Sequence, residues 1–231
     1  MRNLLLVPTL MLAACATTGS SGKSSSAPFQ GVDALKKRHA EIDDAAKTAM
    51  ECLKVKPGEQ PGKGGIFAVV ADAAGKLTVT PIKWDGSDAM KQCVVDAGGK
   101  ATVTPLPGPS VGGLWDFVPP GEKSDPPKVP DDYAVKMQPL RETMQAEVVE
   151  CGTRNLGLDF GATIDVAYYL YTDGKAYAAT VISSDAKDGA FDSCVQEVIN
   201  HTKYPAATVT KPFPITSHFK IGVYGDTRRV Q

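Results

Sequence analysis

The stretch that decides the fold is residues 151–175, CGTRNLGLDFGATIDVAYYLYTDGK, because residues 52–76, CLKVKPGEQPGKGGIFAVVADAAGK, repeat its spacing. In each copy a cysteine stands 23 residues before a Gly-Lys dipeptide. The residues that match at one common offset are Cys52 and Cys151, Gly58 and Gly157, Gly62 and Gly161, Ala68 and Ala167, and Gly75 and Gly174. Glycine and cysteine are types that turns and disulfides require, so we infer two copies of one unit.

The repeat continues after the Gly-Lys dipeptide. A Cys-Val pair recurs, with a bulky apolar residue three positions before each cysteine, and a Pro-x-Pro sequence recurs farther on. These pairs are Cys93 and Cys194, Met90 and Phe191, Pro107 and Pro212, and Pro109 and Pro214. The second copy therefore extends from Cys151 to about Tyr224.

Composition limits the class of protein. The chain has 231 residues, 42% of them hydrophobic, which is enough to bury a core. A formal net charge of -1 argues against a nucleic-acid-binding or anionic-membrane-binding protein. No apolar run approaches the roughly 20 residues that span a bilayer.

The first residues have the features of an export signal. Arg2 gives a short positive region, and an apolar region and small residues follow. The tetrapeptide Leu12-Ala13-Ala14-Cys15 resembles the bacterial lipobox. That resemblance implies cleavage before Cys15, lipidation of this cysteine and, because Ala16 rather than aspartate follows, anchoring at the outer membrane with the domains in the periplasm. An ordinary cleaved signal with a chance cysteine is the alternative.

Four cysteines remain after Cys15, and an even number in an exported chain favours disulfides, with three connectivities open. The repeat selects two local bonds, Cys52 with Cys93 and Cys151 with Cys194. The alternatives are metal ligation and free buried thiols. No Cys-x-x-Cys is present and no histidine lies at ligand spacing from a cysteine pair, so we predict no metal site.

Hydrophobic periodicity predicts helix, hairpin, helix and strand in each copy, an α+β fold with helices on one face of a small antiparallel sheet. In the first copy the expected elements are a helix over 32–53, strands over 66–71 and 77–82, a short helix that Gly98-Gly99 ends, and an irregular strand near 114–118. In the second copy they are a helix with Cys151 on its apolar face, strands over 164–170 and 176–182, a helix containing Cys194 and a last strand over 215–224.

These elements give the expected domain organisation. It comprises a signal peptide at 1–14, a flexible Ser/Gly tether at 15–30, a first domain at 31–118, a Pro-rich linker at 119–132 and a second domain at 133–226. Polyproline character makes the linker semi-rigid.

The second copy resembles the C-terminal domain of TonB-family energy transducers, in particular the paired-cysteine form found in gliding-motility proteins. The residues that carry this resemblance are Val149-x-Cys151, Gly174-Lys175, Asp192-Ser193-Cys194-Val195, Tyr204-Pro205 and Lys211-Pro212-Phe213. The first copy shares the cysteines and the turn but lacks the aromatic-Pro step. TonB proteins also have a transmembrane helix and a periplasm-spanning segment, neither of which this sequence shows. The resemblance therefore implies a binding habit rather than energy transduction: pairing of a partner's extended segment along a sheet edge. It also allows a homodimer.

A search for catalytic motifs in the sequence finds no Gly-x-Ser-x-Gly, His-Glu-x-x-His or phosphate-loop pattern. His39, His201 and His218 are expected on the surface. Tyrosines concentrate on one hairpin, where cross-strand packing is the simpler role and a binding patch the sharper one. The candidate binding residues are Tyr169, Tyr171, Tyr177 and His218.

The sequence thus predicts a protein without catalytic residues, cofactor or metal. Its expected role is a lipid-anchored periplasmic interaction module, whose partner is an envelope protein or peptide segment. The only membrane contact expected is through the lipid. The alternative is a lipoprotein that binds cell-wall glycan through the tyrosine hairpin.

Overall fold

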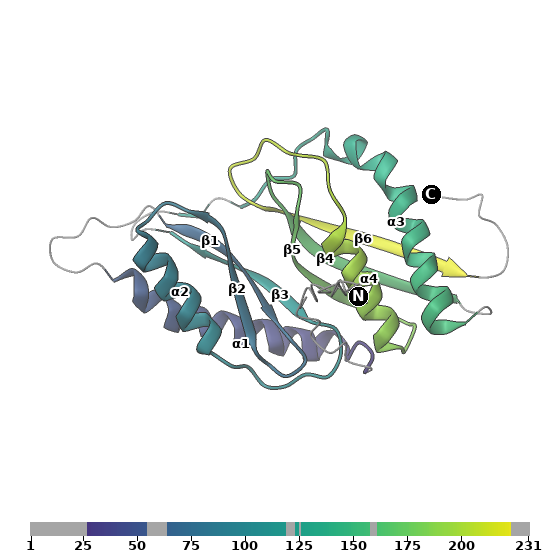
Figure 1. Ribbon diagram of the computed structural model, residues 1–231, viewed down its shortest axis with the longest axis horizontal. Helices are drawn as coiled ribbons and strands as arrows, with labels where there is room; N and C mark the ends of the chain where they lie inside the picture. The colour runs from purple at the N-terminus through teal and green to yellow at the C-terminus, as the bar shows by residue number, and fades with distance from the viewer. Residues whose placement is uncertain (1–26, 55–63, 119–122, 125, 158–160, 223–231) are drawn as a thin grey trace, which may run out of the picture.

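The computed structural model describes residues 27–54, 64–118, 123–124, 126–157 and 161–222 (Figure 1). The predicted signal, Cys15 and most of the tether lie outside these residues, as do parts of the linker and residues 223–226. The elements of the first unit are α1 (Val32–Met50), the 3-10 turn η1 (Glu51–Leu53), β1 (Gly65–Ala71), β2 (Leu77–Trp84), α2 (Asp88–Lys100) and β3 (Val111–Phe117). Those of the second unit are α3 (Tyr133–Leu156), β4 (Gly161–Leu170), β5 (Ala176–Ser184), α4 (Gly189–His201) and β6 (Phe213–Gly222).

The α+β class is confirmed. Each unit holds one three-stranded antiparallel sheet, in the order β2-β1-β3 in the first and β5-β4-β6 in the second. The helices of each unit pack on its own sheet, α1 and α2 against β3 and β2, and α3 and α4 against β6 and β5. Alternate residues of β4 from Ala162 to Leu170 are buried beneath α3 and α4, as a half-buried strand requires.

Both predicted disulfides are confirmed: Cys52 bonds to Cys93, and Cys151 bonds to Cys194. Each bond joins the first helix of a unit, or the turn that ends it, to the second helix.

The turn glycines make the same contact in both units. Gly75 and Gly174 have positive φ, and their carbonyl oxygens accept hydrogen bonds of 2.9 Å from the amides of Val103 and Tyr204, respectively. A Cβ atom on Gly75 would lie 2.1 Å from the Val103 oxygen, and one on Gly174 would lie 2.4 Å from the Tyr204 oxygen. The Gly-Lys dipeptide therefore recurs because the segment after the second helix passes too close to the turn for any side chain.

Two expectations for the first unit are wrong. Helix α2 continues through Gly98-Gly99 to Lys100, and β3 is a regular seven-residue strand that begins at Val111 and includes Gly112 and Gly113. Glycine in general favours a break in a helix, but here neighbouring groups require it: a Cβ atom on Gly98 would lie 2.4 Å from a methyl group of Val79 and within 3.0 Å of the Trp115 ring.

The two glycines of α2 should therefore respond in opposite directions to alanine. Gly98→Ala should lower the free energy of unfolding by about 1–3 kcal/mol, because its methyl group overpacks the core between Val79 and Trp115. Gly99→Ala should raise it by up to about 1 kcal/mol, because no atom lies within 4 Å of the added Cβ and alanine is the better helix former. Urea unfolding of both variants measures the difference. Equal effects would show that helix propensity, rather than close packing, governs position 98.

Candidate interaction edge

The two units contact each other through β3 and β5. The amide of Gly112 donates to the Thr180 hydroxyl oxygen over 2.7 Å, and that hydroxyl lies 3.3 Å from the Gly112 carbonyl oxygen. The same carbonyl lies 3.0 Å from Nε2 of His39 on α1. A Cβ atom on Gly112 would lie 2.5 Å from the Cα and the carbonyl oxygen of Ala178, so only glycine fits there. Ala178 itself has a φ of 54°, where the β4–β5 register shifts.

Gln196 extends this contact from α4. Its buried amide nitrogen donates to the Ser110 carbonyl over 2.8 Å and to the Ala179 carbonyl over 2.6 Å, and its oxygen accepts from the Ser110 hydroxyl over 2.9 Å. One side chain of the second unit thus satisfies polar groups of both units. A buried amide left without these partners would be destabilising, so the contact fixes a specific arrangement.

The contact between the two units also buries the face of β1 that points away from its own helices. Phe67 and Val69 belong to the core beneath the helices of the first unit, whereas Ile66 and Ala68 point to the other face of the sheet and are still only 4% and 3% exposed. Both β1 and β3 contact β5. The nearly continuous apolar run of β1 is therefore explained by cover on both faces, its own helices on one and the second unit on the other.

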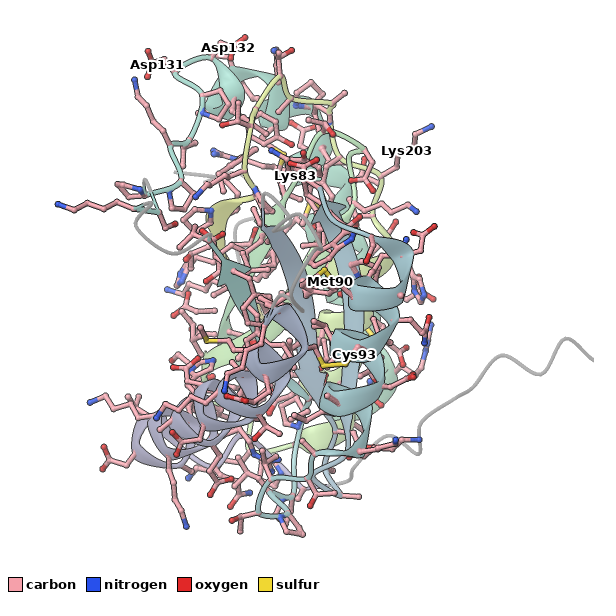
Figure 2. All side chains as sticks on the ribbon, turned by 90° about the vertical axis from the view of Figure 1, so that its left-hand side faces the viewer. Lys83, Met90, Cys93, Asp131, Asp132 and Lys203 are labelled. Carbon is pink, nitrogen blue, oxygen red and sulfur yellow. A yellow bond between two sulfur atoms is a disulfide. The ribbon has the colours of Figure 1, made fainter. Side chains whose placement is uncertain are left out.

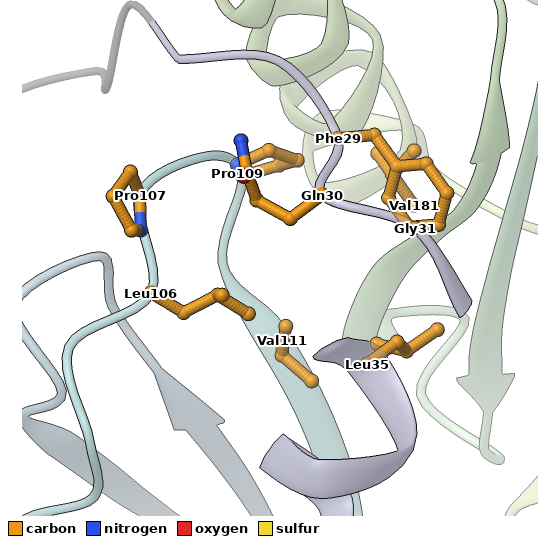
Figure 3. A pocket seen from close by; sticks show the side chains of 9 residues that line it. All are labelled: Phe29, Gln30, Gly31, Leu35, Leu106, Pro107, Pro109, Val111 and Val181. Atoms are coloured by element: carbon orange, nitrogen blue, oxygen red, sulfur yellow. The ribbon is translucent and has the colours of Figure 1, made fainter. Parts of the chain in front are cut away.

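The segment that precedes α1 joins the same contact. The Phe29 amide donates to the Asp192 carboxylate over 3.0 Å, and the Ser184 hydroxyl donates to the other carboxylate oxygen over 2.5 Å. Burial raises the pKa of Asp192, and these two hydrogen bonds partly oppose that rise. The Phe29 ring packs against both cores, beside a small hollow that Figure 3 shows with Val181 on one side and Leu106 on the other.

The sequence-predicted binding residues are only partly brought together. Tyr169 and Tyr177 are register partners on β4 and β5, and both are half-buried, as is Tyr171 just beyond β4. The Tyr177 hydroxyl donates to Asp173 over 2.6 Å, and burial raises the pKa of Tyr177 and of Tyr169. The hairpin tyrosines are thus partly used in packing, which leaves their role in binding a prediction.

The histidines occupy three different environments. His218 is exposed on β6, with Nδ1 2.6 Å from a carboxylate oxygen of Asp165, its register partner on β4. Asp165 lies four residues before Tyr169 along β4. His218 therefore does not form one cluster with Tyr169 and Tyr177. His201 is exposed at the end of α4, as expected. His39 departs from the expected surface position, because it is half-buried against Gly112 at the contact between the units.

Four strands form the edges of the two sheets, and three of the edges are covered or interrupted. β3 and β5 lie against each other. In β2, Pro81 lacks an amide hydrogen, and the register with β1 shifts between Ile66 and Phe67, opposite Ile82 and its neighbours. A proline and a bulge are the devices by which edge strands avoid pairing.

β6 is the edge strand whose register with its neighbour is unbroken. Its ten residues pair with β4 from Phe213 to Gly222 without a register shift, and no described strand lies on its other side. The Lys220 carbonyl accepts a hydrogen bond of 3.2 Å from the Gln145 side chain on α3 rather than from β4. Alternate residues of an antiparallel strand direct their backbone groups to the same side. Thr216, His218 and Lys220 thus present their backbone groups at the open edge. Pro214 faces the same side but has no amide hydrogen, so the part of the edge that can pair with another strand begins after it.

Two other features are absent from the part of the chain that the structure describes, a metal cluster and a membrane-spanning helix. No group of three or more His, Cys, Asp or Glu side chains there could hold a metal ion. Among the same residues no helix has the length and hydrophobicity of a membrane span. β6, as an open edge strand, could bind another chain through its backbone groups.

The fold and the β6 edge define a class: a small α+β protein whose two described sheet units each contain one disulfide, with an open sheet edge along β6. Comparison with models of protein families, with curated proteins and with solved structures finds no match for this chain.

Four residues that join the units were not among the predicted site residues: Gly112, Thr180, Gln196 and Asp192. Asp192 appears in the sequence only as part of the motif Asp192-Ser193-Cys194-Val195. Gly112-Gly113 carried a signal, since adjacent glycines in a strand often mark close approach of another backbone. For Thr180 and Gln196 no local signal distinguishes an interface position from an ordinary one.

Proposed function

We propose that the protein is a non-catalytic, lipid-anchored envelope protein with two tandem TonB C-terminal-like domains, which binds an extended segment of a periplasmic partner as a strand along β6. The observation that carries this proposal is the open stretch of the β6 edge that follows Pro214, because the other three edges are covered or are interrupted within the strand. Main-chain hydrogen bonds to an added strand would supply affinity, and side-chain pockets would supply specificity.

The anchoring part of the proposal rests on the Leu12-Ala13-Ala14-Cys15 tetrapeptide. Cells supplied with a labelled fatty acid should transfer the label to the wild-type chain and not to the Cys15→Ala variant, and the labelled chain should fractionate with the outer membrane. A mature wild-type chain without label would refute the anchor and leave strand addition to be tested by itself.

Thr216→Pro should weaken partner binding at least about tenfold while the protein stays folded. Proline removes an amide that faces the open edge, and its ring obstructs the incoming strand, whereas the bonds from β6 to β4 are retained. Thr216→Val is the matched control, because it keeps the amide and a β-branched side chain. Full-length oxidised proteins are incubated with envelope extract, and proteins retained by wild type and Thr216→Val but lost with Thr216→Pro are identified by mass spectrometry.

A peptide from such a protein must then slow amide hydrogen exchange at Thr216, His218 and Lys220. Equal retention by both variants would contradict strand addition at β6. Retention of the protein on insoluble peptidoglycan, lost in the Tyr169→Ala and Tyr171→Ala variants, would favour the cell-wall glycan alternative instead.

A further inference from the structure

The two disulfides occupy equivalent places in the two units but differ in exposure. Cys93 is exposed on α2, and Cys52 is half-buried. In the second unit Cys151 is 2% exposed and belongs to the core, and Cys194 is half-buried against that core. The sequence separations are similar, 41 and 43 residues, so the difference lies in the surroundings of the bonds and not in the loops that they close.

The packing of the second helix explains this difference. Helix α4 buries Phe191, Val195 and Ile199, three large apolar side chains that set it deeply on its sheet. Helix α2 buries only Val94 and Gly98. Two further apolar residues of α2, Ala89 and Cys93, are exposed.

The surface around Cys93 is open to solvent. A shallow, open hollow on the outer side of α2 is lined by Ala89, Gln92, Cys93, Asp96, Ala97 and Lys100. Figure 2 shows Cys93 on this side of the molecule, next to Met90 and away from the second unit. Thiol–disulfide exchange requires in-line approach of a thiolate to one sulfur, so accessibility is a main determinant of its rate.

We propose that Cys52–Cys93 is a site of reversible thiol–disulfide exchange with a dithiol protein, whereas Cys151–Cys194 is a purely structural bond. A thiolate of the dithiol attacks Sγ of Cys93, which forms a mixed disulfide and releases the Cys52 thiolate. The second thiol of the reductant then attacks the mixed disulfide and releases the Cys93 thiolate. The dithiol ends as a disulfide, and the two electrons and two protons that it loses appear as the thiols of Cys52 and Cys93.

Exchange at this site would act on one unit only. Reduction removes the covalent link between the turn after α1 and α2, while the second unit, which carries the β6 edge, keeps its own bond. The proposal is therefore independent of strand addition at β6.

The test measures how fast each bond is reduced in the folded protein. Full-length oxidised protein is treated with dithiothreitol under native conditions, and samples are quenched with acid, alkylated and digested, so that mass spectrometry gives the reduced fraction of each cysteine. Rates are normalised to those in denaturant, where both bonds are accessible. Cys52 and Cys93 should become reduced at least about ten times faster than Cys151 and Cys194. Equal normalised rates, or faster reduction of Cys151–Cys194, would overturn the proposal.

A second measurement identifies the sulfur that is attacked. A thioredoxin whose resolving cysteine is replaced by serine serves as the dithiol-protein probe, since it traps the mixed disulfide. The trapped adduct should join the probe to Cys93. Adducts on Cys151 or Cys194 in comparable amount, or no adduct on the first pair, would contradict exchange at this site.

Discussion

Replacing Gly112 with alanine should release the two units from their fixed arrangement and lower the free energy of unfolding by about 2–3 kcal/mol. The added Cβ would lie 2.5 Å from the Cα and the carbonyl oxygen of Ala178, and backbone cannot move aside as the end of a flexible side chain can. Displacement of β3 would also break the 2.7 Å hydrogen bond from Gly112 to Thr180. The loss should therefore exceed that of an ordinary glycine-to-alanine change in a strand.

Gly113→Ala is the matched control, because the two glycines are adjacent in β3. A Cβ atom on Gly113 would meet only a methyl group of Ile42, at 3.8 Å, an ordinary van der Waals distance. Thermal unfolding gives the stability of both variants, and small-angle X-ray scattering detects separation of the units as a larger radius of gyration. Equal stability and equal dimensions for both variants would show that the contact between β3 and β5 does not hold the units together.

Removing the Cys151–Cys194 disulfide should cause the largest loss in the free energy of unfolding. Cys151→Ala together with Cys194→Ala should lower the free energy of unfolding by about 4 kcal/mol, because the bond closes a loop with a sequence separation of 43 residues. Cys151 is also 2% exposed within the core, so its truncation adds lost packing. Denaturant unfolding of the double variant, monitored by the near-ultraviolet signal of the second-unit tyrosines, measures the loss.

The double variant Cys52→Ala with Cys93→Ala is the control for loop closure alone. Its loop is nearly the same length, with a sequence separation of 41 residues, but Cys93 is exposed and contributes little packing. A smaller loss in this variant would separate the packing contribution from the entropic one. A loss below about 1 kcal/mol for the Cys151 and Cys194 pair would refute the view that this bond stabilises the second unit.

Together these contacts explain why the β6 edge stays open. Because Gly112 permits β3 to lie against β5, two of the four sheet edges cover each other. Pro81 and a register shift interrupt β2. The arrangement of the two units therefore determines which edge strand stays uncovered, and this strand is β6.

Much of the fold was predictable from local signals. The cysteine spacing gave both disulfides, the alternation of Ile164 and Val166 gave a half-buried strand, and the Gly-Lys dipeptides marked both hairpin turns. The candidate site was less predictable. Alternation of Ile215, Phe219 and Ile221 predicts the last strand. No local pattern distinguishes this open edge strand from β5, which the first unit covers.

Repeat spacing and periodicity by themselves determined the elements, their order and the disulfides, because these features depend on residues close in sequence or on a second copy for comparison. The tertiary structure alone decided what each glycine does and which edge is open. Glycine without a side chain predicts a break in a helix at Gly98, yet Gly98 and Gly112 are each required by an atom that approaches from a distant segment, Val79 in one case and Ala178 in the other. Such contacts depend on how completed elements pack, and a single sequence does not encode that packing in any local pattern.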